Sequence, residues 1–187
     1  MPVVHNASPD EFDSPFFIAN QKICEEFDTY IVGKNGETRG KYNSYSYSVL
    51  GKIRHPQKWE FEIKKASYTS GNLLLDSKYQ SLHTASFWRA KKLETDCTYF
   101  KIRRKKRWDF LLLIIFPKIW RKHSSQGKYV IKSNHPDHDF IFKLNLILKK
   151  LFDSNKIWEI EFENSELEID LRSAELHTEI IDELLKM

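Results

Sequence analysis

The chain has 187 residues, 41% of them hydrophobic and 14% aromatic, with only six Gly and six Pro. This composition is too apolar for a disordered chain, and the length is that of one domain able to bury a core. The formal net charge of +4 conceals a separation of sign, because residues 89–122 carry a net +9 and residues 153–187 a net −8. Such asymmetry bears on association rather than fold, and it predicts either a polyanion-binding surface or two segments that neutralise each other.

Cysteine usage and the first residues predict the compartment. Cys24 and Cys97 lie far apart and belong to no CxxC or Cys/His pattern, so the sequence predicts no disulfide framework, no zinc site and no cofactor. Residues 1–10 lack the basic and apolar regions of a secretory signal. We therefore expect a cytoplasmic protein, with peripheral attachment to a membrane as a further option.

The N-terminal part predicts an arm followed by a helix. Residues 1–13 are polar and aperiodic, which is typical of an arm that orders only when something holds it. Ser14 and Pro15 then predict a capped helix that ends near Val32. The Gly-rich segment 33–41 predicts a turn-rich loop, since its glycine spacing and the tyrosine after Lys41 do not fit a phosphate-binding loop.

A strand pair should come next. Residues 42–54 are rich in tyrosine and apolar side chains, and residues 59–64 alternate strictly between apolar and charged, so the two predict an antiparallel pair. Residues 73–75 and 82–88 are weaker strand candidates, and residues 91–96 are expected to connect two elements.

The central segment combines two short strands with an apolar run. Strands are predicted around residues 100–102 and 129–131. The seven apolar residues from Phe110 to Phe116 fall far short of the roughly 20 that a membrane-spanning helix needs. They predict a buried strand or a short core helix that ends at Pro117.

The last third predicts a helix, a hairpin and a second helix. The tetrapeptide of residues 133–136 is a helix start, with one apolar face downstream. That face consists of Phe140, Leu144, Ile147, Leu148 and Leu151. Residues 157–163 and 167–171 predict a hairpin with an outward carboxylate face, and Ser173 is expected to cap the last helix. The whole pattern predicts one α+β domain over residues 14–187, with a largely antiparallel sheet packed against a few amphipathic helices.

Two clusters invite a functional interpretation. His135, Asp137 and His138 could bind a metal, although the same residues suit a helix start. The stronger signal is a basic segment with interleaved tryptophans. Its candidate binding residues are Lys101, Arg103, Arg104, Lys105, Lys106, Arg107, Trp108, Lys118, Trp120, Arg121 and Lys122. Such a segment suits a nucleic-acid backbone, an anionic membrane surface or a solvated turn beside a buried strand.

The order of features resembles a diffuse group of uncharacterised bacterial proteins. The resemblance covers about residues 20–187 and rests on the segments 47–51, 128–134, 158–162 and 167–171. In that group a soluble module of this kind often follows membrane-spanning helices, which this sequence lacks. The chain also has Ser124 to Gly127 where such proteins often carry an acidic Phe-Asp element. The resemblance implies no catalytic activity.

No recognisable catalytic triad or nucleophile motif is present, so we expect a non-enzymatic interaction module. Its partner is expected to be a protein, as for an immunity protein or a complex subunit, or an anionic membrane surface. Nucleic-acid binding through residues 101–122 is the alternative, and a metal-dependent enzyme using residues 135–139 is the second alternative. Nothing in the pattern predicts an oligomeric state.

Overall fold

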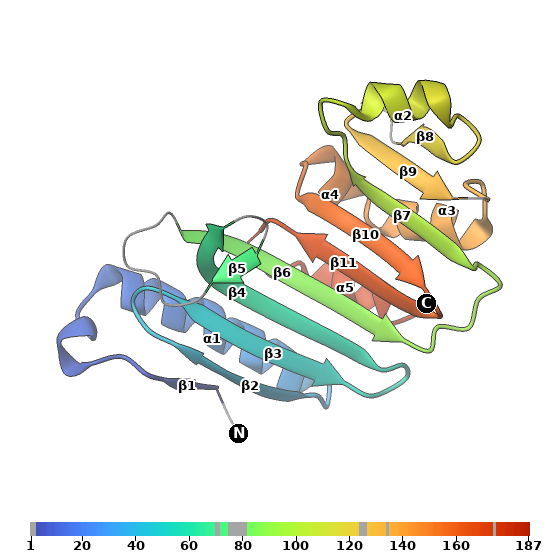
Figure 1. Cartoon of the computed structure of the whole chain (residues 1–187). Coiled ribbons are helices and arrows are strands. Elements are labelled where there is room, and N and C mark those ends of the chain that lie inside the picture. The colour runs from blue at the N-terminus through green and yellow to red at the C-terminus, as the bar shows by residue number, and fades with distance from the viewer. Residues whose placement is uncertain (1–2, 70–71, 75–81, 124–126, 134, 174) are drawn as a thin grey trace. The chain divides into compact units, whose positions relative to one another are not determined.

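A computed structural model of the chain describes residues 3–69, 72–74, 82–123, 127–133, 135–173 and 175–187. The chain has the predicted α+β fold, with a mostly antiparallel sheet and helices (Figure 1). Contacts divide it into two compact units, Met1–Trp88 with Arg172–Thr178 and Arg89–Leu171 with Glu179–Met187. The single domain expected from the sequence stays a prediction.

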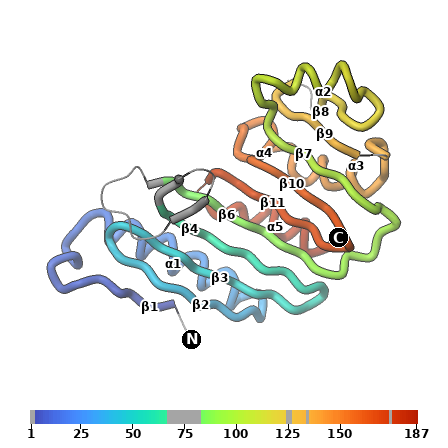
Figure 2. Tube along the Cα trace, in the orientation of Figure 1, coloured from blue at the N-terminus to red at the C-terminus, as the bar shows by residue number. Residues whose placement is uncertain are grey.

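The first unit is a sheet with one long helix against it. Its elements are β1 (Val3–His5), the short 3-10 helix η1 (Pro9–Glu11), α1 (Pro15–Gly33), β2 (Glu37–Tyr42), β3 (Tyr47–Ile53), β4 (Trp59–Thr69), β5 (Asn72–Leu74) and most of β6 (Leu82–Lys91). The strand order is β1-β2-β3-β4-β6, with β5 paired to β4. The helix α1 runs along β2 and β3, as the chain trace shows (Figure 2).

The helix α1 begins where the sequence predicts. Pro15 occupies its first position, and the Ser14 hydroxyl accepts a hydrogen bond from the Phe16 amide at 3.3 Å. Phe17, Cys24, Phe27 and Ile31 are buried along one face, at the spacing of successive helical turns. The helix therefore forms because a local cap and one apolar stripe agree.

The predicted loop over residues 33–41 is wrong in its second half. Residues Glu37–Tyr42 form β2, which pairs antiparallel with β3 across a turn at residues 43–46. The expected strand over residues 42–54 therefore begins only at Tyr47, as β3. Gly40 allows this pairing, since a Cβ there would lie 2.4 Å from the Ser48 carbonyl oxygen. The antiparallel pairing of β3 with β4 is confirmed.

The N-terminal arm is held in place by two sets of contacts. The strand β1 pairs parallel with β2, with Val3 opposite Gly40. The Glu11 carboxylate accepts hydrogen bonds from the Ser44 amide at 2.9 Å and from the Ser44 hydroxyl. These bonds lower the pKa of Glu11 to about 2, because they stabilise its charged form.

The second unit is built on a five-stranded antiparallel sheet. It contains β7 (Tyr99–Arg104), α2 (Asp109–Ile115), β8 (Trp120–His123), β9 (Tyr129–Ser133), α3 (Asp139–Ile147), α4 (Lys149–Asp153), β10 (Ile157–Glu163), β11 (Glu166–Leu171) and most of α5 (Thr178–Leu184). The strand order is β11-β10-β7-β9-β8, and every neighbouring pair is antiparallel. The helices α3, α4 and α5 lie on one face of this sheet (Figure 1).

Two helices begin at other residues than predicted. The helix α3 begins at Asp139, capped by the His138 ring, whose Nδ1 accepts from the Phe140 amide at 3.1 Å. Ser133 does not cap it, because Ser133 belongs to β9; the predicted Asn134 lies outside the described residues. Likewise Ser173 accepts from the Glu175 amide, and α5 begins only at Thr178.

The apolar run of residues 110–116 differs most from the prediction. It is a helix, α2, but not a core element. Of its side chains Ile114 is 71% exposed and Ile115 61%. The prediction of a buried strand or core helix is therefore wrong in burial, since α2 contacts the edge strand β8 and leaves most of its apolar side chains exposed.

Candidate functional site

The predicted basic segment divides into structural cations and exposed ones. Lys101 is a structural cation, half-buried on β7. Its Nζ lies 2.7 Å from Glu159 and 3.0 Å from Glu161, both on the neighbouring strand β10. Its charge is therefore neutralised within the sheet. For this residue, the basic segment and the acidic segment neutralise each other, which was one of the two expectations from the charge asymmetry.

Arg103 is also structural. Its guanidinium donates to both carboxylate oxygens of Asp109 at 2.7 Å and lies 5.0 Å from the centre of the Trp120 ring. Asp109 is buried, and the hydrogen bonds from Arg103 hold the pKa of Asp109 below its usual range. The pair fastens the start of α2 to β7, and the half-buried Trp120 ring packs against the Arg103 guanidinium.

The Arg104 guanidinium donates its hydrogen bonds to backbone carbonyls. Its Nε donates to the Ile157 carbonyl at 2.9 Å and its Nη2 to the Asn155 carbonyl, while the guanidinium stacks 5.6 Å from the Trp158 ring. Arg104 therefore joins β7 to the start of β10 and fixes the chain segment that follows it.

The remaining predicted cations are exposed around α2. They are Lys105, Lys106, Arg107, Lys118, Arg121 and Lys122. Arg121 lies 3.7 Å from the highly exposed Asp137, a weak and screened contact. For the other five side chains, no ion pair is found within the part of the chain that the structure describes. We call these six residues the cationic rim.

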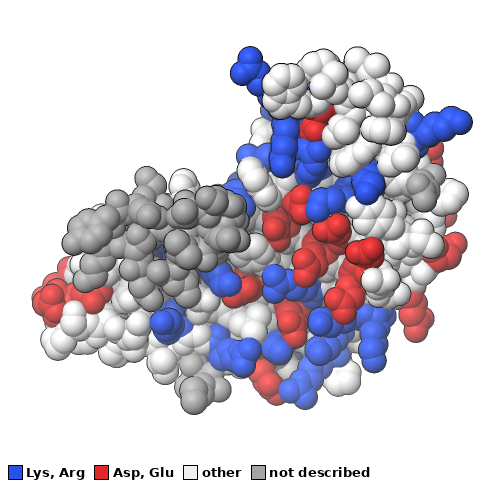
Figure 3. Space-filling view, in the orientation of Figure 1, with Lys and Arg blue, Asp and Glu red and all other residues white. Residues whose placement is uncertain are grey.

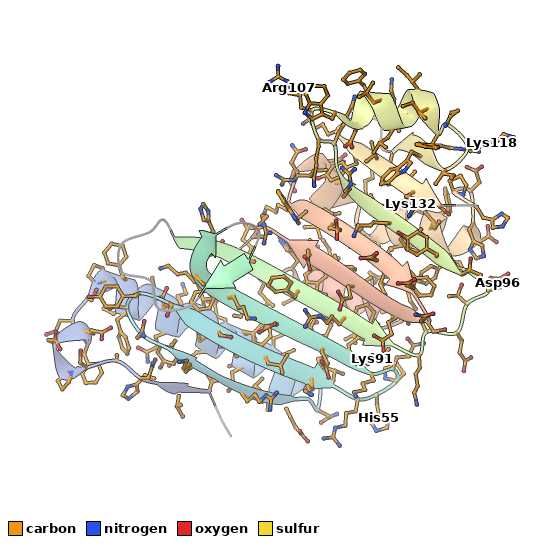
Figure 4. All side chains as sticks on the ribbon, in the orientation of Figure 1. His55, Lys91, Asp96, Arg107, Lys118 and Lys132 are labelled. Carbon is orange, nitrogen blue, oxygen red and sulfur yellow. The ribbon has the colours of Figure 1, made fainter. Side chains whose placement is uncertain are left out.

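An apolar surface lies inside the cationic rim. Its large exposed side chains are Trp108, Phe110, Leu111, Ile114, Ile115, Phe116 and Ile119, of which Trp108 is 68% exposed. Uncharged atoms cover this end of the second unit, with Lys and Arg atoms at its margins (Figure 3). Arg107 and Lys118 project from opposite ends of α2 (Figure 4). We call this set of seven residues the α2 surface.

Sequence reasoning found the cations but missed the α2 surface. The signal was present, because six consecutive residues from Phe110 to Ile115 are too continuously apolar for a half-buried helix of seven residues. Exposed apolar patches of this kind are typical of interaction surfaces.

The histidine cluster is not assembled as a ligand set. His138 uses Nδ1 to cap α3, and its Nε2 lies 3.0 Å from Asp96. Asp137 is 95% exposed and faces Arg121, and His135 is exposed. Within the described ranges no group of three His, Cys, Asp or Glu side chains could hold a metal ion.

The sequence did not predict that carboxylates on β10 would lie opposite carboxylates on β11. Opposing positions on β10 and β11 pair Glu159 with Asp170, Glu161 with Glu168 and Glu163 with Glu166. Burial, with the charges of Glu168 and Glu159, raises the pKa of Asp170 to about 7. The alternation predicted the carboxylate face, but the register decided which acids meet.

No helix among the described residues is long and apolar enough to cross a membrane. Neither a family model nor a curated protein matches the chain. The resemblance to bacterial modules therefore stays a prediction.

Proposed function

We propose that this protein docks on an anionic membrane surface through the α2 surface and the cationic rim. The observation that carries the proposal is the seven-residue helix whose apolar side chains face solvent between two groups of cations. An interfacial helix inserts its apolar face about 5–10 Å into the boundary of headgroups and acyl chains. Seven residues make a helix about 10 Å long, which suits such shallow insertion and not a span.

The apolar side chains supply the first part of the binding energy. Burying a large apolar side chain contributes about 1.5–3 kcal/mol, and those of the α2 surface are roughly half-exposed. Their insertion is therefore worth on the order of 5–10 kcal/mol before the entropy of immobilisation is subtracted. Trp108, at the start of α2, suits the headgroup level, where tryptophan is enriched.

The cations supply the second part and favour a bilayer over the alternatives. Each cation near an anionic surface is worth about 1 kcal/mol. Four of the six rim residues are lysines, a residue depleted from protein interfaces, which argues against a protein partner. A nucleic acid would leave Ile114 and Ile115 against water, which argues against the nucleic-acid alternative.

The test is co-sedimentation with vesicles of phosphatidylcholine alone and with 30% phosphatidylserine added, at low and near-physiological salt. We expect binding to the anionic vesicles that weakens with salt. The double variant Ile114→Asp and Ile115→Asp should bind at least tenfold more weakly, because it places two charges in the inserting face. Lys118→Glu with Lys122→Glu should do the same through the rim.

Matched controls lie on the first unit. Ile18→Asp with Val32→Asp changes two exposed apolar residues of α1, and Lys22→Glu with Lys58→Glu reverses two exposed lysines. Both should bind like the parent chain. Failure of the parent to bind either vesicle, equal binding by the α2 variants, or binding to RNA in place of vesicles would overturn the proposal.

A further inference from the structure

We infer that the N-terminal side of the cationic rim contains a site for a phosphate monoester, the headgroup of an anionic lipid. The inference rests on the proposed membrane docking and names the ligand for part of the same surface. The site is a shallow hollow of about 580 Å³ lined by Arg104, Lys105, Lys106, Arg107, Gly127, Lys128 and Asn155. Five of these seven residues are cationic and none is acidic.

The backbone around the hollow is fixed by named hydrogen bonds. The Lys105 amide donates to the Lys128 carbonyl at 2.8 Å, which closes the hollow between two chain segments. The Lys106 amide donates to the Asp109 carboxylate, and Arg104 is held on the Asn155 and Ile157 carbonyls. The lysine and arginine side chains therefore extend from an ordered frame rather than from a free loop.

The charge of the hollow is not balanced by the neighbouring acid. Asp109 and Asp153 each lie two residues in sequence from a lining residue. Both Asp109 oxygens already accept from Arg103, and among the described residues Asp153 has no ion pair with a lining cation. Over the described residues, the side chains of Lys105, Lys106, Arg107 and Lys128 have no ion pair. Four uncompensated cations around one hollow favour an anion of more than one charge.

A phosphate monoester fits this arrangement better than a singly charged headgroup. It carries a charge of about −1.5 to −2 at neutral pH and three oxygens that accept charge-assisted hydrogen bonds. A phosphodiester has two such oxygens and one charge. Arg107 directly precedes Trp108 of the α2 surface, so a headgroup in the hollow would belong to a lipid beside the inserted helix.

The test compares vesicles that contain phosphatidic acid with vesicles that contain phosphatidylserine, at matched surface charge. We expect at least fivefold tighter binding to phosphatidic acid. Lys106→Gln with Lys128→Gln should remove that preference, whereas Lys118→Gln with Lys122→Gln should weaken binding to both vesicles and keep the preference. The second pair removes the same charge at the other end of α2.

The outcomes separate this inference from the proposed function. Equal binding to both vesicles at matched charge overturns the headgroup site and leaves membrane docking standing. Binding to neither vesicle overturns both. Titration calorimetry with millimolar inorganic phosphate tests whether the hollow binds the free ion. If the chain binds phosphate but shows no preference for phosphatidic acid, the ligand is free phosphate and the assignment to a lipid headgroup is wrong.

Discussion

The guanidinium of Arg103, at the end of β7, holds both carboxylate oxygens of Asp109, the first residue of α2, at 2.7 Å. Both side chains are largely buried, with 13% and 5% of their surface exposed. This contact determines where the α2 surface is presented, because it fastens an otherwise exposed seven-residue helix to the sheet. The pair thus positions the α2 surface, which is the proposed docking surface.

Replacing Asp109 with Asn should destabilise the protein. The variant leaves the Arg103 charge largely buried without its carboxylate, so we expect the free energy of unfolding to fall by about 2–4 kcal/mol. The measurement is urea unfolding followed by tryptophan fluorescence. Asp153→Asn, an exposed acid at the end of α4, is the control and should change stability by less than about 0.5 kcal/mol. Equal stability of both variants would contradict the structural role of the pair.

Because α2 is exposed, we expect a charged substitution in it to leave the stability of the protein nearly unchanged. Ile114→Asp should change the free energy of unfolding by less than about 1 kcal/mol, because Ile114 is 71% exposed. Leu144→Ala in α3 should cost about 2–5 kcal/mol, because Leu144 is fully buried. Thermal unfolding of the two purified variants checks this contrast. A large loss of stability for Ile114→Asp would mean that α2 is a core helix.

Asp170 predicts a specific dependence of stability on pH. Its folded-state pKa, about 7, lies above its ordinary value of 3.8, so its contribution to stability is present below about pH 4 and is lost as the pH rises through 7. Asp170→Asn should therefore stabilise the protein at pH 8 by about 1–2 kcal/mol and change it little at pH 4. The effect is smaller than the full pKa difference implies, because solvent partly screens the Asp170 charge.

The pH series should be measured by chemical unfolding of the parent and of Asp170→Asn between pH 4 and 8. Glu166→Gln is the matched control, because it removes an acid from the same strand at an exposed position. The difference in unfolding free energy between Glu166→Gln and the parent should not change between pH 4 and 7. A stability difference for Asp170→Asn that does not change with pH would refute the raised pKa of Asp170 as its cause.

Glu11 predicts the opposite pH dependence. Its pKa is lowered from 4.5 to about 2, chiefly by the Ser44 hydroxyl, so its contribution is present above about pH 4.5 and is lost as the pH falls through 2. Glu11→Gln should therefore loosen the N-terminal arm at neutral pH. Hydrogen exchange of amides 3–13 and 44 should accelerate about tenfold, whereas Asp10→Asn, in the same turn, should not accelerate it.

The sequence alone determined the elements whose signals are local. The Ser14 cap and the apolar stripe of α1 depend on neighbours within one or two turns, and both are confirmed. The alternation in β10 and β11 likewise predicted a hairpin with a charged face, because strand side chains alternate wherever a strand lies. The sequence likewise identified the cations of the basic segment, but it did not predict which acids, carbonyls or aromatic rings they contact.

Tertiary structure decided what each signal is used for. Ser133 has the chemistry of a helix cap, but it lies in β9 and donates to the Tyr99 carbonyl, so His138 caps α3 instead. Arg103 and Lys106 are equally basic in sequence, yet one is neutralised by Asp109 and the other faces solvent. The apolar run before Pro117 could have been core, but it lies beside the edge strand β8, where most of its side chains are exposed. Burial and pairing depend on residues far away in the chain, which periodicity does not encode.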